Sequence, residues 1–212
     1  MGAKRISYID IIIGLAGGVI STSIGAIVAK WLDIASRPSF NPIKITATPI
    51  CFPNKEVFIQ CSYMFEIKWK SPKAPKRLFV TKSMLLAENA QGWVELEGLH
   101  SSPAPWGYGY HYAMDIVGKE SLVVLFLNKN CLKDLNNCNL FFPVRPINSP
   151  RWEWDPRSNL FEYNQFKNRK LKIRVASRNA NGTEIPCELA KFVERCIEAC
   201  KSDQDCKKYL NT

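Results

Sequence analysis

The longest apolar stretch of the chain covers residues 11–29 and contains no charged residue. As a helix with a rise of about 1.5 Å per residue, it would span roughly 28 Å, which is close to the hydrocarbon thickness of a bilayer. Tyr8 and Trp31 flank the stretch, and aromatic rings of this kind favour the headgroup region. The pattern predicts a transmembrane helix over residues 11–31, preceded by a short tail at residues 1–10. A cleaved signal peptide is the alternative, although its apolar region is usually shorter, at roughly 7–15 residues.

Small residues recur every four positions in this stretch and form one broad face of the predicted helix. Such a face lets helix backbones approach closely, and serine or threonine can donate hydrogen bonds across the contact. We expect this helix to associate with a transmembrane helix of a second copy or of a partner subunit. A glycine-rich anchor without a partner is the alternative, because glycine is common in membrane helices. The face comprises Gly14, Gly17, Gly18, Ser21, Thr22 and Gly25.

Farther along the chain the pattern changes to short β-branched and aromatic runs. In the clearest run, residues 170–177, the apolar residues Leu171, Ile173 and Val175 alternate with basic ones, as in a half-buried strand. An Asn-Gly pair follows and predicts a hairpin turn. The runs together predict an antiparallel β-sandwich or barrel-like domain over residues 43–186. The other predicted strands are residues 43–48, 56–63, 65–69, 78–81, 93–97, 111–116 and 122–128.

The end of the chain has helical periodicity. Within the segment 187–212, the apolar side chains fall on one face of a helix. Ser202 stands three positions before Asp205, which resembles a capping box and predicts the start of a second short helix. We therefore predict a mainly β fold that ends in a cysteine-containing helical hairpin, with residues 32–42 as the linker after the membrane helix. The apolar face comprises Leu189, Phe192, Val193, Cys196, Ile197 and Cys200.

The cysteines indicate a compartment. The chain has 212 residues and eight cysteines, all of which follow the apolar stretch. A high and even number of cysteines is typical of disulfide bonds in an oxidising environment. We therefore expect the chain to be anchored in the cell membrane, with its domain outside the cytoplasm. Free thiols packed as small apolar groups are the alternative. The expected bonds are Cys51–Cys61 across a hairpin, Cys131–Cys138 around a polar loop, and two bridges among Cys187, Cys196, Cys200 and Cys206.

The chain is basic, with a formal net charge of +10, and nearly all of that charge follows the apolar stretch. Basic residues concentrate in residues 68–82 and 167–178. A basic domain held at a membrane can contact anionic lipid or an acidic protein, so we expect these partners besides the bilayer itself. Solvated faces without a partner are the alternative. We do not expect nucleic acid as a partner, because the cysteines favour the outside of the cell.

An aromatic segment is the candidate binding surface of the domain. If the segment is extended, Trp106, Tyr108, Tyr110 and Tyr112 point to one side, with glycines between them. Such a face could bind a sugar or an extended peptide. The alternative is that these rings form one layer of the core.

Motifs that would indicate catalysis are missing from the sequence. There is no glycine-rich phosphate loop, no nucleophile elbow, no zinc-protease motif and no C-x-x-C pair, so we expect neither an enzyme nor a cofactor or metal site. The leading hypothesis is a single-pass membrane protein that presents a disulfide-braced β-rich domain for binding or assembly. The alternative is a bacterial membrane-anchored effector, for example in antiviral defence, with a cytosolic sensing domain and a helix that perturbs the membrane.

Overall fold

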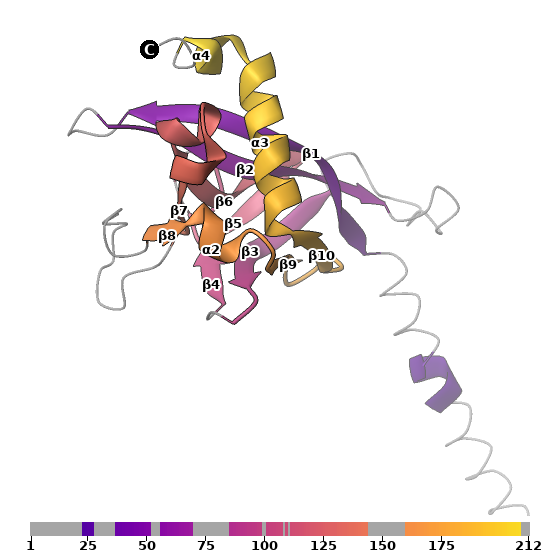
Figure 1. Cartoon of the computed structure of the whole chain (residues 1–212). Coiled ribbons are helices and arrows are strands. Elements are labelled where there is room, and N and C mark those ends of the chain that lie inside the picture. Colours follow the sequence, from indigo (N-terminus) through magenta and orange to yellow (C-terminus); the bar gives the residue numbers. More distant parts are fainter. Residues whose placement is uncertain are drawn as a thin grey trace, which may run out of the picture.

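The computed structural model of the chain is mainly β, with short helices toward the C-terminus (Figure 1). Two antiparallel sheets make up the described part, as the period-two runs in the sequence predict. The residues that the structure describes are 23–27, 37–51, 56–69, 85–98, 101–107, 109, 111–143 and 160–208.

Sheet A is built around strands that are buried on both faces. In β6 (Lys119–Asn128), an unbroken apolar run is buried along its whole length, which is typical of a strand in the middle of a sheet. β2 (Val57–Trp69) lies between β6 and β1 (Pro38–Cys51), and β1 is the edge strand. The order of the sheet is β1-β2-β6-β7-β8, where β7 is Asn139–Phe141 and β8 is Leu160–Glu162.

Sheet B contains the strand that the sequence predicts most clearly. In β9 (Lys170–Ala176), Leu171, Ile173 and Val175 are buried and the residues between them are not, which confirms the predicted alternation. The order of the sheet is β10-β9-β3-β4, and β5 also pairs with β3. These strands are β3 (Leu86–Leu96), β4 (Ser102–Ala104), β5 (Ala113–Val117) and β10 (Thr183–Glu188).

One hydrophobic core joins both sheets and the C-terminal helix. A Cβ atom at Gly92 of β3 would overlap the side chain of Leu122 of β6, so a larger residue at this position would force Leu122 to shift. The largest buried side chain in the core is that of Trp106. Its ring stacks on Phe40 at a centroid distance of 6.1 Å and meets Phe65 edge-on at 5.9 Å.

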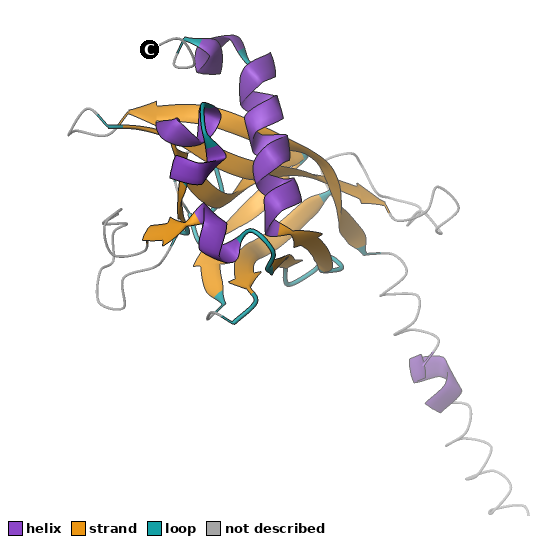
Figure 2. Ribbon diagram, in the orientation of Figure 1, coloured by secondary structure: helices purple, strands orange, loops and turns teal. Residues whose placement is uncertain are grey.

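The helix α3 (Leu189–Ser202) lies across β1 and β2 (Figures 1 and 2). All six apolar residues of its predicted face are buried, which confirms the helical period. The short helix α4 (Gln204–Lys207) follows, so the second helix is also present. Its cap is Asp203 rather than the predicted Ser202, because the Asp203 carboxylate accepts hydrogen bonds from the backbone of Asp205 and Cys206.

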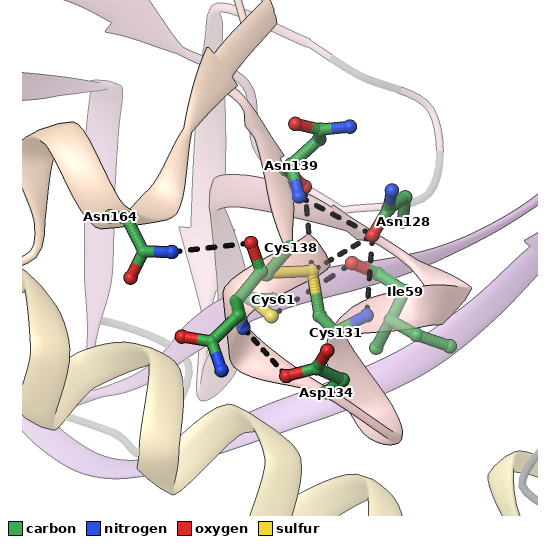
Figure 3. The surroundings of a disulfide bond; sticks show 9 residues. Ile59, Cys61, Asn128, Cys131, Asp134, Cys138, Asn139 and Asn164 are labelled. Carbon is green, nitrogen blue, oxygen red and sulfur yellow. Dashed lines mark hydrogen bonds between the residues drawn. A yellow bond between two sulfur atoms is a disulfide. The ribbon is translucent and has the colours of Figure 1, made fainter.

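A compact disulfide loop follows β6 and contains the 3-10 turns η2 (Lys129–Leu132) and η3 (Leu135–Asn137) (Figure 3). The Asn128 side-chain oxygen accepts hydrogen bonds from the backbone N–H groups of Cys131 at 3.2 Å and Asn139 at 3.4 Å. The single turn α2 (Tyr163–Phe166) lies beside this loop, where the Asn164 side chain donates to the Asn136 carbonyl at 3.2 Å.

Three predicted boundaries are wrong. β1 begins at Pro38, inside the predicted linker, because an edge strand tolerates prolines whose missing N–H would face away from its neighbour. The runs predicted on either side of Met64 form one continuous strand, β2. β10 extends to Glu188 and takes the first residues of the predicted helical hairpin. The predicted strand at residues 78–81 lies outside the described residues.

Candidate functional site

The predicted membrane helix lies mostly outside the described residues. Within it, residues 23–27 are helical, and of the predicted association face only Gly25 is described. No described helix has both the length and the apolar character needed to cross a bilayer. The prediction of a span over residues 11–31 therefore stays a prediction.

Trp106 does not lie on the predicted flat aromatic face. Trp106 is fully buried, because the segment turns back on itself and does not stay extended. The backbones of Trp106 and His111 exchange two hydrogen bonds, at 2.7 and 3.2 Å, and Gly107 adopts a positive φ of 59° between them. Tyr112 is half-buried, and Tyr108 and Tyr110 lie outside the described residues. Trp106 therefore belongs to the core and not to a binding surface.

The structure contains two of the expected disulfides. Cys131 is bonded to Cys138, with a Cα–Cα distance of 4.3 Å, as predicted. In the C-terminal segment Cys200 is bonded to Cys206, with a Cα–Cα distance of 5.1 Å. Among the described cysteines Cys51, Cys61, Cys187 and Cys196 are free thiols, so only one of the two bridges expected in that segment is present.

The predicted Cys51–Cys61 bond is wrong because of the strand register. Cys51 lies opposite Val57, whereas Cys61 lies opposite Ala47. The two cysteines are thus offset by roughly 13 Å along the strands, at about 3.3 Å per residue. A disulfide needs a Cα separation of about 4.4–6.8 Å.

Three of the free cysteines lie close together, on α3, β2 and β10. Cys196 of α3 is completely buried and forms a hydrogen bond with the thiol of Cys61 in β2; burial, followed by this bond, raises the pKa of Cys196 well above its ordinary value. Burial also raises the pKa of Cys187 to about 11, against the smaller opposing effect of the Arg195 guanidinium. Cys187 and Cys196 are therefore neutral at physiological pH, where a thiol is a poor nucleophile and metal ligand. Among the described residues no cluster of His, Cys, Asp and Glu could hold a metal ion.

A groove lies between α3 and β1. It consists of two adjoining cavities, of about 410 Å³ and about 560 Å³, which we call together the α3–β1 groove. Ile45, Tyr63 and Arg195 line both cavities and so mark the middle of the groove. The first cavity extends toward Lys170 and β10, and the second extends along β1 from Ile43 to Ala47.

The floor of the groove is rigid because it is part of the core. Tyr63 packs on Phe65 with ring centroids 5.4 Å apart and stacks on Phe192 of α3 at 6.5 Å. Ile45 packs against the same core cluster, in which Phe192 is buried. Because these contacts are between sheet and helix, the groove holds its shape without a ligand.

The charged side chains of the groove are only partly paired. Lys191 forms an ion pair with Glu188 at 3.1 Å, and Asp203 caps α4. Lys44, Lys170 and Arg195 form no ion pair with any described residue, and the groove carboxylates without one are Glu198 and Asp203. The groove therefore has an excess of unpaired positive charge.

The β1 side of the groove also has backbone groups without a hydrogen-bond partner among the described residues. Five consecutive residues, Ile43–Ala47, line the second cavity. Since successive side chains of a strand point to opposite faces, a cavity that meets five in a row lies along the strand edge. At this edge the Asn181 N–H donates to the Pro38 carbonyl at 2.8 Å, but no described group bonds to the open-edge backbone between Pro42 and Pro49.

The strongly basic strand of the sequence differs from the groove, because most of its cations are paired, and only its first residue, Lys170, lines the groove. In β9, Lys172 pairs with Glu184 at 3.3 Å, and Arg174 pairs with Glu95 at 2.6 Å and with Glu184 at 3.2 Å. These carboxylates come from the neighbouring strands β3 and β10. Lys172 and Arg174 are thus neutralised within sheet B.

Sequence reasoning missed the groove because its two sides are distant in the chain. Arg195 belongs to the polar side of the predicted helix, and Ile45 to a predicted strand about 150 residues earlier, so no local pattern joins them. No protein-family model, curated protein or solved structure matches the chain. The case for the α3–β1 groove therefore depends on its geometry and charge.

Proposed function

We propose that this chain is a single-pass membrane protein whose β-rich head recruits a protein partner through the α3–β1 groove. The observation that carries the proposal is the groove itself. It combines a preformed apolar floor, unpaired cations and an open strand edge, which are the features of a binding site and not of a solvated surface.

The tether is supported by the sequence and by one described turn. The stretch at residues 11–29 has the length and composition of a membrane helix. Residues 23–27 are helical, and Ile24 and Ile27 are 56% and 68% exposed, so this turn presents apolar side chains that lipid would cover. The small-residue face of the same helix would serve assembly with a second membrane helix.

The disulfides support a head outside the cytoplasm. Cys131–Cys138 and Cys200–Cys206 both close short loops, and such bonds persist in oxidising compartments. The second candidate, a membrane-anchored effector with a cytosolic sensing head, is favoured by the free thiols, of which Cys51 is exposed.

Thiol labelling on intact cells tests the tether and its orientation. Cys51 is an exposed free thiol, so a membrane-impermeant maleimide should label it from outside in cells that produce the full chain, and a Cys51→Ser variant should lose that label. The chain should also stay in the membrane pellet after carbonate extraction. Labelling only after lysis would support the cytosolic head, and release by carbonate would contradict the tether.

Site-specific photo-crosslinking tests the groove. A photoreactive side chain in place of Lys44 lies in the groove, whereas one in place of Val117, which is exposed in β5, lies outside it. We expect the Lys44 position to crosslink to a defined protein in the native membrane and the Val117 position not to do so. Identical crosslinks from both positions would contradict recruitment through the groove.

A further inference from the structure

We propose that the groove binds an extended, acidic peptide segment, which adds to the open edge of β1 as a further strand and places a carboxylate on Arg195. This inference depends on the proposed function, because it names the chemistry of the partner that the same groove takes. The segment would be part of another protein and would pair with about six residues of β1, from Ile43 to Thr48.

The backbone of β1 supplies the first part of the argument. In an antiparallel pair, about half of the N–H and C=O groups of an edge strand point away from its neighbour. From Ile43 to Thr48 these outward groups meet no described partner. Pro42 and Pro49 lack an N–H and bound this segment on both sides, so the length of strand that can be added is limited.

Charge supplies the second part. Arg195 lies in the middle of the groove, and Lys44 and Lys170 lie toward its two ends. All three lack an ion pair among the described residues, and they outnumber the two groove carboxylates that also lack one, Glu198 and Asp203. A ligand carboxylate would thus meet an unpaired guanidinium, which can donate two parallel hydrogen bonds to it.

The floor supplies the third part. Alternate side chains of an added strand would point toward α3 and would pack over Ile45 and Tyr63. These residues offer an apolar contact, while the Tyr63 hydroxyl has no hydrogen-bond partner among the described residues. The ligand therefore combines β-branched or other apolar residues with at least one aspartate or glutamate.

A displayed library of random hexapeptides, selected on the full chain in lipid nanodiscs, tests the inference. We expect enriched sequences to alternate apolar residues with an acidic one. The strongest of these peptides, made synthetically, should bind at least tenfold more weakly to Arg195→Gln, because a hydrogen bond to a charged group is lost. Arg174→Gln is the matched control, since it removes the same charge from the paired face of sheet B and should leave the affinity unchanged.

Backbone methylation of the same peptide tests strand addition directly. Methylating the N–H groups of alternate residues can be done in two ways, which give two sets of methylated peptide. One set lacks every donor that points to β1, and the other set lacks every donor that points away from β1. We expect one set to abolish binding and the other to retain it, because only one edge of the added strand pairs with β1.

The outcomes separate this inference from the proposed function. If the Lys44 position crosslinks to a partner but no acidic peptide is enriched, or both methylated sets bind equally, strand addition is wrong and recruitment through the groove stands. If the enriched peptides bind equally to the Arg195→Gln and Arg174→Gln chains, the role of Arg195 is wrong. If neither crosslinks nor peptides are obtained, both proposals fail.

Discussion

The outer face of β9 and the α3–β1 groove both contain closely spaced basic residues, yet they differ in how those charges are balanced. On β9, Arg174 lies between carboxylates from two neighbouring strands, at 2.6 and 3.2 Å. In the groove, Arg195 lies beside an apolar floor without an ion pair among the described residues. Basic residues therefore stabilise the fold in one region and remain available for a ligand in the other.

The difference shows that the number of charges in a segment does not locate a site. Antiparallel pairing places β9 directly beside strands that carry glutamates, so Lys172 and Arg174 find partners as soon as the sheet forms. Arg195 of α3 lines both cavities of the groove, and no carboxylate of a neighbouring strand pairs with it among the described residues. Three substitutions or measurements would sharpen this contrast.

The largest effect is expected from the floor of the groove. Phe192→Ala would leave a cavity between α3 and β2, and we expect it to lower the free energy of unfolding by about 3–5 kcal/mol in a urea titration. Tyr63→Phe, which keeps the ring and removes only the hydroxyl, should change stability little. Equal effects of the two changes would mean that the floor is not part of the core.

The next effect concerns Cys187, which lies in the groove and has a pKa raised to about 11 by burial. At pH 8 roughly one thiol in a thousand would be ionised in the folded chain, against about a quarter in an unfolded chain with an ordinary thiol. In a Cys51→Ser chain, alkylation of Cys187 by iodoacetamide, followed by mass spectrometry, should be at least a hundredfold slower when folded. The rate should rise toward pH 11, and an acidic peptide bound in the groove should slow it further. A folded rate that equals the denatured rate would contradict the burial of this thiol.

The smallest effect separates the two arginines directly. Arg174→Gln removes exposed ion pairs, whose contribution is about 0.2–1 kcal/mol, and the loss should diminish at high salt. Arg195→Gln removes no ion pair among the described residues and should leave the free energy of unfolding unchanged. Thermal unfolding at low and high salt would check this. A larger loss for Arg195→Gln would show that Arg195 has a structural role.

The elements that the sequence predicts well are those whose periodicity is set by one buried face. β9 alternates because one side faces the core, and α3 places its six apolar residues on one side for the same reason. β6 is apolar throughout because both of its faces are buried. β4, β7 and β8 are only three residues long and carry too little pattern to be found.

The site and the disulfide pairing depend on contacts that no local pattern contains. The register of β1 against β2 separates Cys51 from Cys61, and sequence spacing alone cannot give that register. The turn at Gly107 places Trp106 in the core, although its spacing from the next tyrosines suggests an extended strand. The groove likewise forms only when α3 packs across β1.

The prolines of β1 have a consequence for aggregation. An open strand edge invites the same edge of another copy to pair with it, and long uninterrupted edges lead to aggregates. In β1 the residues Pro38, Pro42 and Pro49 interrupt this edge, and Pro186 interrupts β10 at the edge of the other sheet. Two copies that paired along these edges could therefore form only a short ladder between them.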